Sequence, residues 1–454
     1  MRNITYSDRW GKKRLGLLFQ ENTHKNIECI EKTAYQFYFG SIVPKQKFDL
    51  TPDVIEIYKK YIKIKQDDII INGLNLNYDF ISQRVGYVHS KGIITSAYIC
   101  LRPLKDVNSR YYVFLLKAMD AQKVFHGLGT GIRKTLSFSE LKNVLLPVPP
   151  REEQEQIVRF LDWKVSSINK LINIKQQEIT ELKELKKATI SAAVTHGLDK
   201  TVPMKDSGIA WIGKIPQHWN VKRLKYISLK HFSGTWGNEC DGSSNDKNCI
   251  RVADFNFENL TLSISKSTKR NYTCGEIRKY ALQDGDILVE KSGGGRKTPV
   301  GRAIYYNLNG SFLYANFIEM IRVKQQNSKF LVYLLAYMYH SGYINTMYNQ
   351  TTGIQNLDIS KYMNQLIVLP PRNEQDHIVR FLDARCAEID HLISEKQAQI
   401  TNLHDLKSSL IADVVTGQID VRDVEIPDYK QVEETLDETD TEDLVDDEEE
   451  VAEV

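Results

Sequence analysis

Two stretches of the chain carry apolar residues at alternating spacings of three and four, which is the pattern of a coiled-coil helix. Each stretch follows a Pro-Pro pair and runs without Gly or Pro as far as Thr195 in the first copy and Thr416 in the second. The residue before a proline avoids helical backbone, while the second proline can occupy the first turn. We predict helices beginning near Pro150 and Pro371, each roughly 65 Å long at about 1.5 Å per residue. The seam positions are Leu161, Val165, Ile168, Ile172, Lys175, Ile179, Leu182 and Lys186, then Leu382, Cys386, Ile389, Ile393, Lys396, Ile400, Leu403 and Lys407.

The two helical stretches are copies of one another. Residues 150–199 align with residues 371–420 without a gap, and 24 of these 50 pairs are identical. Lys175 and Lys396 interrupt the two seams at the same place, where a polar residue can fix the register. A coiled coil needs a partner, and each copy is the obvious partner of the other. We therefore expect the helices to pair antiparallel, related by a pseudo-twofold axis; the alternative is that each helix packs on its own globule.

Each helix is preceded by a segment with the mixed pattern of an α/β globule. Short apolar runs predict strands, and a longer apolar stretch near the end of each segment predicts a helix. The predicted strands are 68–71, 97–101, 286–289 and 317–321, and the predicted helices are 112–123 and 330–339. Both segments open with a similar sequence around Trp10 and Trp219, and both contain Thr-Gly-Ile, at 130–132 and 352–354. The duplication therefore extends into the globules.

These patterns predict an α+β chain in which two α/β globules are separated by two long antiparallel coiled-coil helices. The expected divisions are 1–148 for the first globule, 149–203 for the central helical spacer, 204–369 for the second globule, 370–421 for the distal helical spacer and 422–454 for an acidic tail. The tail holds 16 Asp and Glu residues against only Arg422 and Lys430. Because acidic segments with few aromatic residues cannot bury enough apolar surface to fold, we expect the tail to be disordered.

The formal net charge of +2 conceals a basic body. Without the tail, residues 1–421 carry a net charge of +16, and the two globule segments contribute +10 (residues 1–150) and +9 (residues 204–371). A basic surplus shared evenly by two divergent segments suits a polyanionic partner, and it favours nucleic acid over charge that serves solubility alone.

Recognisable catalytic machinery is absent from the sequence. Residues 293–298, Gly-Gly-Gly-Arg-Lys-Thr, lack the adjacent Gly-Lys and the upstream Gly of a Walker phosphate loop. The six cysteines have no CxxC spacing and the ten histidines no ligand motif, which argues against a zinc site and a disulfide framework. No run of about 18 apolar residues and no signal core is present, so we expect no membrane span and a reduced, cytoplasmic setting. The chain has the character of a DNA-binding protein that holds no metal or cofactor of its own.

Candidate DNA contacts lie in basic, polar and Gly-containing loops of both globules. Arginine and lysine bind phosphates and can read guanine, whereas Asn and Gln match the edge of adenine. The candidates are Asn72, Asn75, Asn77, Arg84, Arg133 and Lys134 in the first globule, and Lys291, Ser292, Arg296, Lys297, Arg302, Gln355 and Asn356 in the second. The cluster at 291–297 carries the stronger signal, because three glycines allow a close backbone approach and two cations follow at once. For any single candidate the alternative is an ordinary solvated loop residue.

Three sequence features resemble one known family. Residues 206–219, Asp-Ser-Gly-Ile-Ala-Trp-Ile-Gly-Lys-Ile-Pro-Gln-His-Trp, are followed by Lys222-Arg223-Leu224. This stretch resembles the opening of a target-recognition domain in specificity subunits of type I restriction–modification systems. The Pro-Arg-x-Glu-Gln helix starts and residues 412–421 are similar to that family's central and distal spacer regions. The resemblance covers nearly everything except the acidic tail, which departs from the family's usual frame.

The resemblance implies a subunit without catalytic activity, whose two target-recognition domains each read one half of a bipartite site in double-stranded DNA. It implies that the helix pair fixes the length of an unread spacer. Two modification (methyltransferase) subunits and two restriction subunits would assemble with it and would hold S-adenosylmethionine, ATP and magnesium. Two alternatives remain: a specificity subunit that serves a fused methylase–nuclease partner, and a coiled-coil scaffold that binds DNA without sequence preference.

Overall fold

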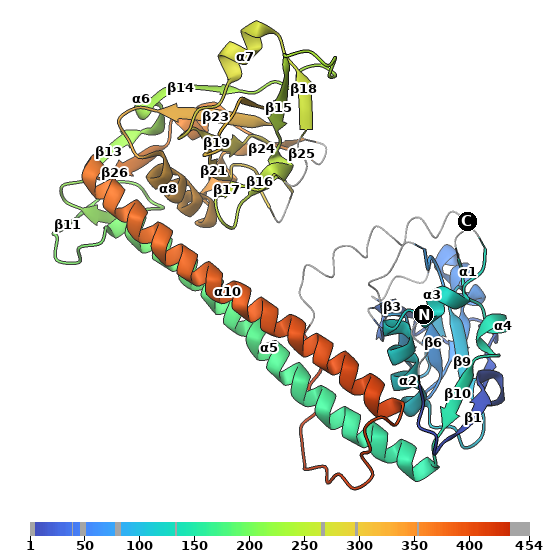
Figure 1. Cartoon of the computed structure of the whole chain (residues 1–454). Coiled ribbons are helices and arrows are strands. Elements are labelled where there is room, and N and C mark those ends of the chain that lie inside the picture. The colour runs from blue at the N-terminus through green and yellow to red at the C-terminus, as the bar shows by residue number, and fades with distance from the viewer. Residues whose placement is uncertain are drawn as a thin grey trace. The chain divides into compact units, whose positions relative to one another are not determined.

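The structure is a computed structural model that describes residues 5–38, 40–45, 51–77, 83–131, 134–264, 268–295, 298–351 and 354–435. The chain forms two compact units: unit 1 comprises Met1–Gln177 with Lys396–Val454, and unit 2 comprises Glu178–Glu395. Each unit contains one α/β globule and part of each of two long helices (Figure 1). We call residues 5–148 globule 1 and residues 204–369 globule 2.

Globule 1 is built around an antiparallel four-stranded sheet in the order β2-β9-β6-β7. These strands are β2 (Phe19–Glu21), β9 (Ile99–Pro103), β6 (Ile69–Ile71) and β7 (Val85–Tyr87). Helix α2 (Ser109–Ala121), capped by the Asn108 side chain, lies against the sheet at β7. The smaller elements are β1 (Gly11–Arg14) paired with β10 (Leu145–Val148), β3 (Tyr35–Tyr38) with β4 (Ser41–Pro44), β5 (Ile62–Ile64) with β8 (Gly92–Ile94), and the helices η1 (Leu15–Leu17), α1 (Pro52–Lys60), α3 (Val124–Leu128) and α4 (Phe138–Leu141).

Globule 2 repeats this topology with a sheet in the order β14-β23-β19-β21. Its strands are β14 (Ser228–Ser233), β23 (Ile318–Val323), β19 (Ile287–Glu290) and β21 (Ala303–Tyr305), and helix α8 (Ser328–His340) lies beside β21. Strand β13 (Asn220–Arg223) pairs with β26 (Leu366–Leu369), as β1 pairs with β10 in globule 1. The remaining strands and helices are β11 (Met204–Asp206), β12 (Lys214–Pro216), α6 (Leu224–Ile227), β15 (Asp246–Ile250), η2 (Val252–Asp254), β16 (Phe255–Asn256), β17 (Thr261–Leu262), β18 (Thr268–Asn271), α7 (Cys274–Tyr280), β20 (Ser292–Gly293), β22 (Phe312–Tyr314), η3 (Tyr343–Thr346), β24 (Tyr348–Thr351), β25 (Ile354–Leu357) and α9 (Ile359–Met363).

The predicted strands and helices are therefore confirmed within a few residues at each end, and so is the duplicated α+β architecture. A buried ion pair also recurs in the two sheets. The carboxylate of Asp68 accepts hydrogen bonds from Arg102 at 2.9 and 2.7 Å, and that of Asp286 accepts them from Arg322 at 2.6 and 2.5 Å. Both carboxylates are fully buried, so each depends on its arginine to offset the loss of solvation.

The long helices are α5 (Arg151–His196) and α10 (Arg372–Val415) (Figure 1). In unit 1, Asn169 of α5 accepts a hydrogen bond from Lys407 of α10 at 3.1 Å, while the earlier Gln156 contacts the later Val421 at 3.0 Å. In unit 2, Lys186 of α5 contacts Asp390 of α10 at 2.6 Å. Rising numbers on α5 thus meet falling numbers on α10, which makes the pair antiparallel. The apolar seam residues are buried or half-buried, as the heptad pattern predicts.

One junction, repeated in both units, attaches each globule to the helices. The indole of Trp10 donates to Glu153 in the first turn of α5, and the indole of Trp219 donates to Glu374 in the first turn of α10, both at 3.0 Å. A glycine that follows the other long helix also packs at each junction: Gly417, after α10, lies beside Trp10, and Gly197, after α5, lies beside Trp219. A Cβ on Gly417 would lie 2.6 Å from the Trp10 ring, and both Gly197 and Gly417 have positive φ, which only glycine adopts at little cost.

The acidic tail requires a correction, because its first part is not disordered. Residues 424–435 lie along α5 and α10 of unit 1, where Val424 and Ile426 pack against the core of globule 1. Side chains of both helices bind this segment by hydrogen bonds and an ion pair. Composition alone predicted disorder because the partners of the segment lie more than 200 residues earlier on α5. Residues 436–454 lie outside the described part of the chain.

Candidate nucleic-acid interface

In globule 1 the structure brings the two predicted groups of DNA contacts together. The loop that follows β6 carries Asn72, Asn75 and Asn77, and it packs against the turn closed by Thr130 and Thr135, which carries Lys134. The backbone N–H of Leu76 donates to the Lys134 carbonyl at 3.1 Å, and that of Leu136 donates to the Gly73 carbonyl at 2.9 Å. A Cβ on Gly73 would lie 2.4 Å from the Leu136 oxygen, so glycine is required for this close approach. Asn75 and Lys134 are exposed at the surface of this cluster.

Arg84, predicted as a DNA contact, is instead an interior residue with 1% of its surface exposed. Its guanidinium donates to the carbonyls of Asn72 and Leu74 at 3.2 and 2.7 Å. Its backbone N–H donates to the Asp120 carboxylate at 2.8 Å. Burial raises the pKa of Asp120, and the hydrogen bond from Arg84 opposes that rise. Arg84 therefore holds the 72–77 loop in place from inside, while Asn72 caps the same loop by accepting from the Leu74 N–H at 3.1 Å.

In globule 2 the equivalent loop after β19 is paired with a β-hairpin. Strand β20 pairs with β25, and β25 pairs with β24, so that Ser292 lies opposite Asn356 and Gly293 opposite Gln355. The Leu357 N–H also donates to the Lys291 carbonyl at 2.8 Å. The candidates at 291–292 and 355–356 are thus assembled into one cluster. It occupies the same place after the central sheet strand as the cluster in globule 1.

The outward face of this hairpin is rich in amides. Asn349 and Asn356 lie opposite one another on β24 and β25, and both are exposed, as is Gln350. Ser292 donates to the Asn356 oxygen at 2.7 Å, which directs the amide nitrogen of Asn356 away from Ser292. An amide held in a fixed orientation on a strand has the chemistry required to pair with the edge of adenine.

Lys291 is positioned by a chain of polar contacts that begins in the sheet. Its ammonium donates to Ser233 at 2.8 Å, and Ser233 donates to Glu319 at 2.6 Å. The other oxygen of Glu319 lies 2.9 Å from Nδ1 of His231. Glu319 is buried, so this network directs Lys291 from inside the globule while keeping a cation beside the amide hairpin.

Three further candidates in globule 2 have structural contacts that account for them. Ser292 and Gln355 are buried, and Gln355 joins two backbone segments by accepting from the Val300 N–H at 3.2 Å and donating to the Gly295 carbonyl at 3.2 Å. Arg302 forms a bidentate pair with the buried Glu290, at 2.8 and 3.1 Å. These residues therefore support the candidate interface from the interior of globule 2. The candidates Arg133, Arg296 and Lys297 lie outside the described residues.

Two surface residues next to the second cluster were not predicted. The sequence does not mark β24 and β25 as a hairpin, so Asn349 was not predicted; the amides at Asn349 and Asn356 on facing strands were the available signal. Phe317 is 48% exposed, and its carbonyl accepts from the Lys291 N–H at 2.8 Å. An exposed ring at this point offers apolar contact, such as the thymine methyl group requires.

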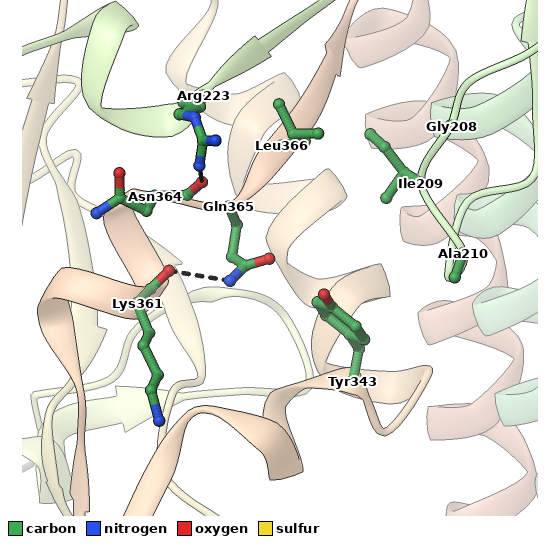
Figure 2. A pocket seen from close by; sticks show the side chains of 9 residues that line it. All are labelled: Gly208, Ile209, Ala210, Arg223, Tyr343, Lys361, Asn364, Gln365 and Leu366. Carbon is green, nitrogen blue, oxygen red and sulfur yellow. Dashed lines mark hydrogen bonds between the residues drawn. The ribbon is translucent and has the colours of Figure 1, made fainter.

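A separate cavity of about 440 Å³ lies at the β13–β26 pair of globule 2 (Figure 2). Arg223 and Lys361 contribute its cations, and the turn at 208–210 forms one wall. Arg223 is occupied by a hydrogen bond to the Asn364 carbonyl at 2.9 Å, and the Gln365 amide donates to the Lys361 carbonyl at 3.0 Å. None of the predicted DNA contacts that the structure describes lines this cavity, so we do not assign it to the candidate interface.

Two classes of site are not found in the described part of the chain. No cluster of three or more His, Cys, Asp or Glu side chains there could hold a metal ion. Among the same residues, no helix combines the length and the apolar character needed to span a bilayer.

Comparison with known proteins agrees with the duplicated frame. The model of the type I restriction modification DNA specificity domain matches twice, at residues 8–184 and 216–402. The type I restriction enzyme MjaVIII specificity subunit of Methanocaldococcus jannaschii is 24% identical over 81% of this chain and 84% of its own length. The type I restriction enzyme StySPI specificity subunit of Salmonella potsdam is 25% identical over 82% of this chain and 80% of its own length.

A solved chain shares the fold at a TM-score of 0.65, with 16% identity, over 91% of this chain and 99% of that one. It comes from work on complex assembly and conformational transition of the type I restriction–modification system. The two domain matches cover most of the chain, and each takes in one globule and most of the long helix that follows it. The chain therefore belongs to the family of type I restriction–modification specificity subunits, which are non-catalytic DNA-recognition proteins, and it contains the DNA specificity domain of that family twice.

Proposed function

We propose that the two clusters read the two halves of a bipartite DNA sequence. The first is the 72–77 loop with Lys134, and the second is Lys291 with the β24–β25 hairpin. The observation that carries the proposal is that one frame, present twice, holds two clusters of different composition at equivalent positions. Two heads of different chemistry suit a two-part asymmetric target, whereas a scaffold that binds DNA without preference has no need of them.

Within each cluster we assign different roles to cations and amides. Lys134 and Lys291 bind phosphates and fix the register of the globule on the duplex. Asn75 in globule 1, and Asn349 and Asn356 in globule 2, read base edges, with adenine the preferred partner of an amide. Arg133, Arg296 and Lys297 stay in the proposal as further cations of the same two loops.

A specificity subunit of a type I system works in a complex with modification and restriction subunits. We propose two of each, because the Trp–Glu junction between globule and helix occurs once in each unit and offers a partner two similar docking sites. S-adenosylmethionine, ATP and magnesium would then be held by those partners, and methylation and cleavage would be theirs. We propose that the protein acts in the cytoplasm, because its proposed binding partner is DNA.

The test exchanges single residues in one globule and reads both half-sites. Asn356→Ala in globule 2 should cost about 1–3 kcal/mol of discrimination at one base pair of one half-site and leave the other half-site unchanged. Asn75→Ala in globule 1 is the matched control and should affect only the other half-site. Sequencing of methylated bases in cells that carry each variant gives both readings. Loss at both half-sites from either substitution would contradict the assignment of one globule to one half-site.

A salt titration separates phosphate contacts from base contacts. Lys134→Ala should weaken binding to all sequences alike and lower the slope of log affinity against log salt by about 0.9. Asn356→Ala should leave that slope unchanged. Equal slopes for Lys134→Ala and the unaltered protein would remove Lys134 from the interface.

A further inference from the structure

The C-terminal segment 424–435 is held by its backbone. Three polar residues of α5, spaced by three and four positions, lie on one face of the helix and contact it: Ser166, Asn169 and Asn173. Ser166 donates to the Lys430 carbonyl at 3.1 Å and accepts from the Val432 N–H at 2.7 Å. Asn169 donates to the Val432 carbonyl at 3.1 Å. Asn173 donates to the Glu433 carbonyl and accepts from the Thr435 N–H, both at 2.9 Å.

Helix α10 supplies the complementary charge. The carboxylate of Glu434 forms an ion pair with Lys407 and lies 3.3 Å from Nε2 of His404. Lys407 also donates to Asn169, so the charge-binding and backbone-binding parts of the face are joined by a direct hydrogen bond. Lys407 also acts on its surroundings: burial, and to a lesser extent the charge of Lys407, lowers the pKa of Lys117 on α2 to about 8.

Unit 2 shows what the same helix positions do without the segment. At the constant offset between the repeats, Lys186 is the counterpart of Lys407 and Asp390 is the counterpart of Asn169. Lys186 is paired within the helices, since Asp390 lies 2.6 Å away. In unit 1 the matching helix position is the uncharged Asn169, and the carboxylate comes from Glu434 of the C-terminal segment. The helix sequence in unit 1 thus lacks the acid that the segment provides.

We propose that this face of α5 and α10 is a binding site for an extended acidic peptide, and that residues 424–435 of the same chain are its occupant. The amide and hydroxyl side chains recognise any extended backbone, and Lys407 together with the His404 ring selects a carboxylate at one position. The site is distinct from DNA recognition, because none of its residues belongs to either candidate cluster. A tether of a few residues after the end of α10 keeps the segment at high effective concentration beside its site.

The first test uses the full-length protein and hydrogen exchange. The N–H groups of Val432 and Thr435 donate to Ser166 and Asn173, so they should exchange slowly in the intact chain. Asn173→Ala should speed hydrogen exchange across residues 430–435 by about tenfold, because the variant loses one or two hydrogen bonds to the segment. Ser167→Ala is the matched control: Ser167 is exposed on the same helix and donates to its own helix at Trp163. Fast exchange of both amides in the intact chain would overturn the proposal.

The second test measures affinity and selectivity without asking a truncated chain to fold. A protease site placed between Asp423 and Val424 allows the segment to be cut from the folded protein and then washed away. A labelled peptide of residues 424–435 should rebind to the cut protein, as followed by fluorescence anisotropy. A Glu434→Gln peptide should bind about tenfold more weakly, because it loses a charge-assisted contact. Equal binding of a scrambled peptide of the same composition would overturn the site.

The same experiments identify the source of the occupant. If the segment came from a second copy of the chain, the uncut protein would form dimers, and cleavage by the protease would dissociate them. Light scattering would detect this change, and that result would overturn the assignment to the same chain. Because neither test contains DNA, failure here leaves the proposed reading of DNA untouched, and failure of DNA reading leaves this site standing.

Discussion

Arg302→Ala decides whether an arginine that resembles a DNA contact in sequence serves that purpose. Arg302 holds the carboxylate of Glu290 with two hydrogen bonds, and its guanidinium carbon lies 3.6 Å from the centre of the Phe257 ring. Glu290 is 2% exposed and is the last residue of strand β19. Removal of the arginine would leave a carboxylate buried in the sheet without its cation.

The expected loss of stability follows from these contacts. Orphaning a buried charge costs about 3–5 kcal/mol, and the partial exposure of the Arg302 side chain places this case at the lower end. The stacked cation on Phe257 adds about 0.5–1 kcal/mol. We expect Arg302→Ala to destabilise globule 2 by about 3–4 kcal/mol. A second change, Glu290→Gln, removes the buried charge and should recover at least about 1 kcal/mol.

Hydrogen exchange is the appropriate assay, because a chain of two units need not unfold in one step. Amides of β19 and β21 should exchange faster in Arg302→Ala, and those of globule 1 should be unchanged. DNA affinity, measured at a temperature where the variant is folded, should fall little. Asn356→Ala provides the contrast, with unchanged exchange and altered discrimination. Unchanged exchange in β19 together with weakened DNA binding would refute the reasoning and return Arg302 to the interface.

Two further predictions concern charge and helix length. Because the pKa of Lys117 is lowered to about 8 from 10.5, folded protein releases this proton before unfolded protein does, so stability should rise by up to about 1.4 kcal/mol per unit between pH 8 and 10.5. Lys117→Met should stabilise unit 1 at pH 7 and abolish that rise in denaturant titrations; a variant whose advantage does not shrink with increasing pH contradicts it. Duplication of residues 176–182 in α5 together with 397–403 in α10 preserves the antiparallel register and adds roughly 10 Å. The unread gap in the methylated sequence should then lengthen by up to about three base pairs, and an unchanged gap would show that the helices do not set it.

Local patterns in the sequence were sufficient for the frame. The heptads of α5 and α10 predicted both helices and their seam, because period and capping are properties of neighbouring residues. The pairing of the two long helices with one another was predicted from the similarity of their sequences. An insertion in α5 needs its counterpart in α10, because contacts such as that of Asn169 with Lys407 join the two helices.

Residue roles in the candidate interface could not be assigned from type and position in the loop. Arg84 and Arg302 are basic residues beside Gly-containing loops, as a DNA contact would be, yet the guanidinium of each is held by groups that the sequence does not mark. The guanidinium of Arg84 donates to the backbone carbonyls of Asn72 and Leu74, and a carbonyl is present whatever the residue type. The same limit explains the acidic segment, whose composition predicts disorder until the ladder on α5 is known. Contacts of this kind are set by the tertiary fold.

The comparison between the repeats separates what holds the protein together from what reads DNA. Frame contacts recur with the same chemistry: Arg110 pairs with Asp162 in unit 1 as Lys329 pairs with Asp383 in unit 2, both at 2.7 Å. The Trp–Glu junctions and the buried sheet ion pairs recur likewise. The two clusters differ in composition, with an asparagine loop in globule 1 and an amide hairpin in globule 2. A duplicated protein that bound one repeated sequence would need the same chemistry in both clusters, so their different composition supports the proposal that the two globules read different half-sites on a shared frame.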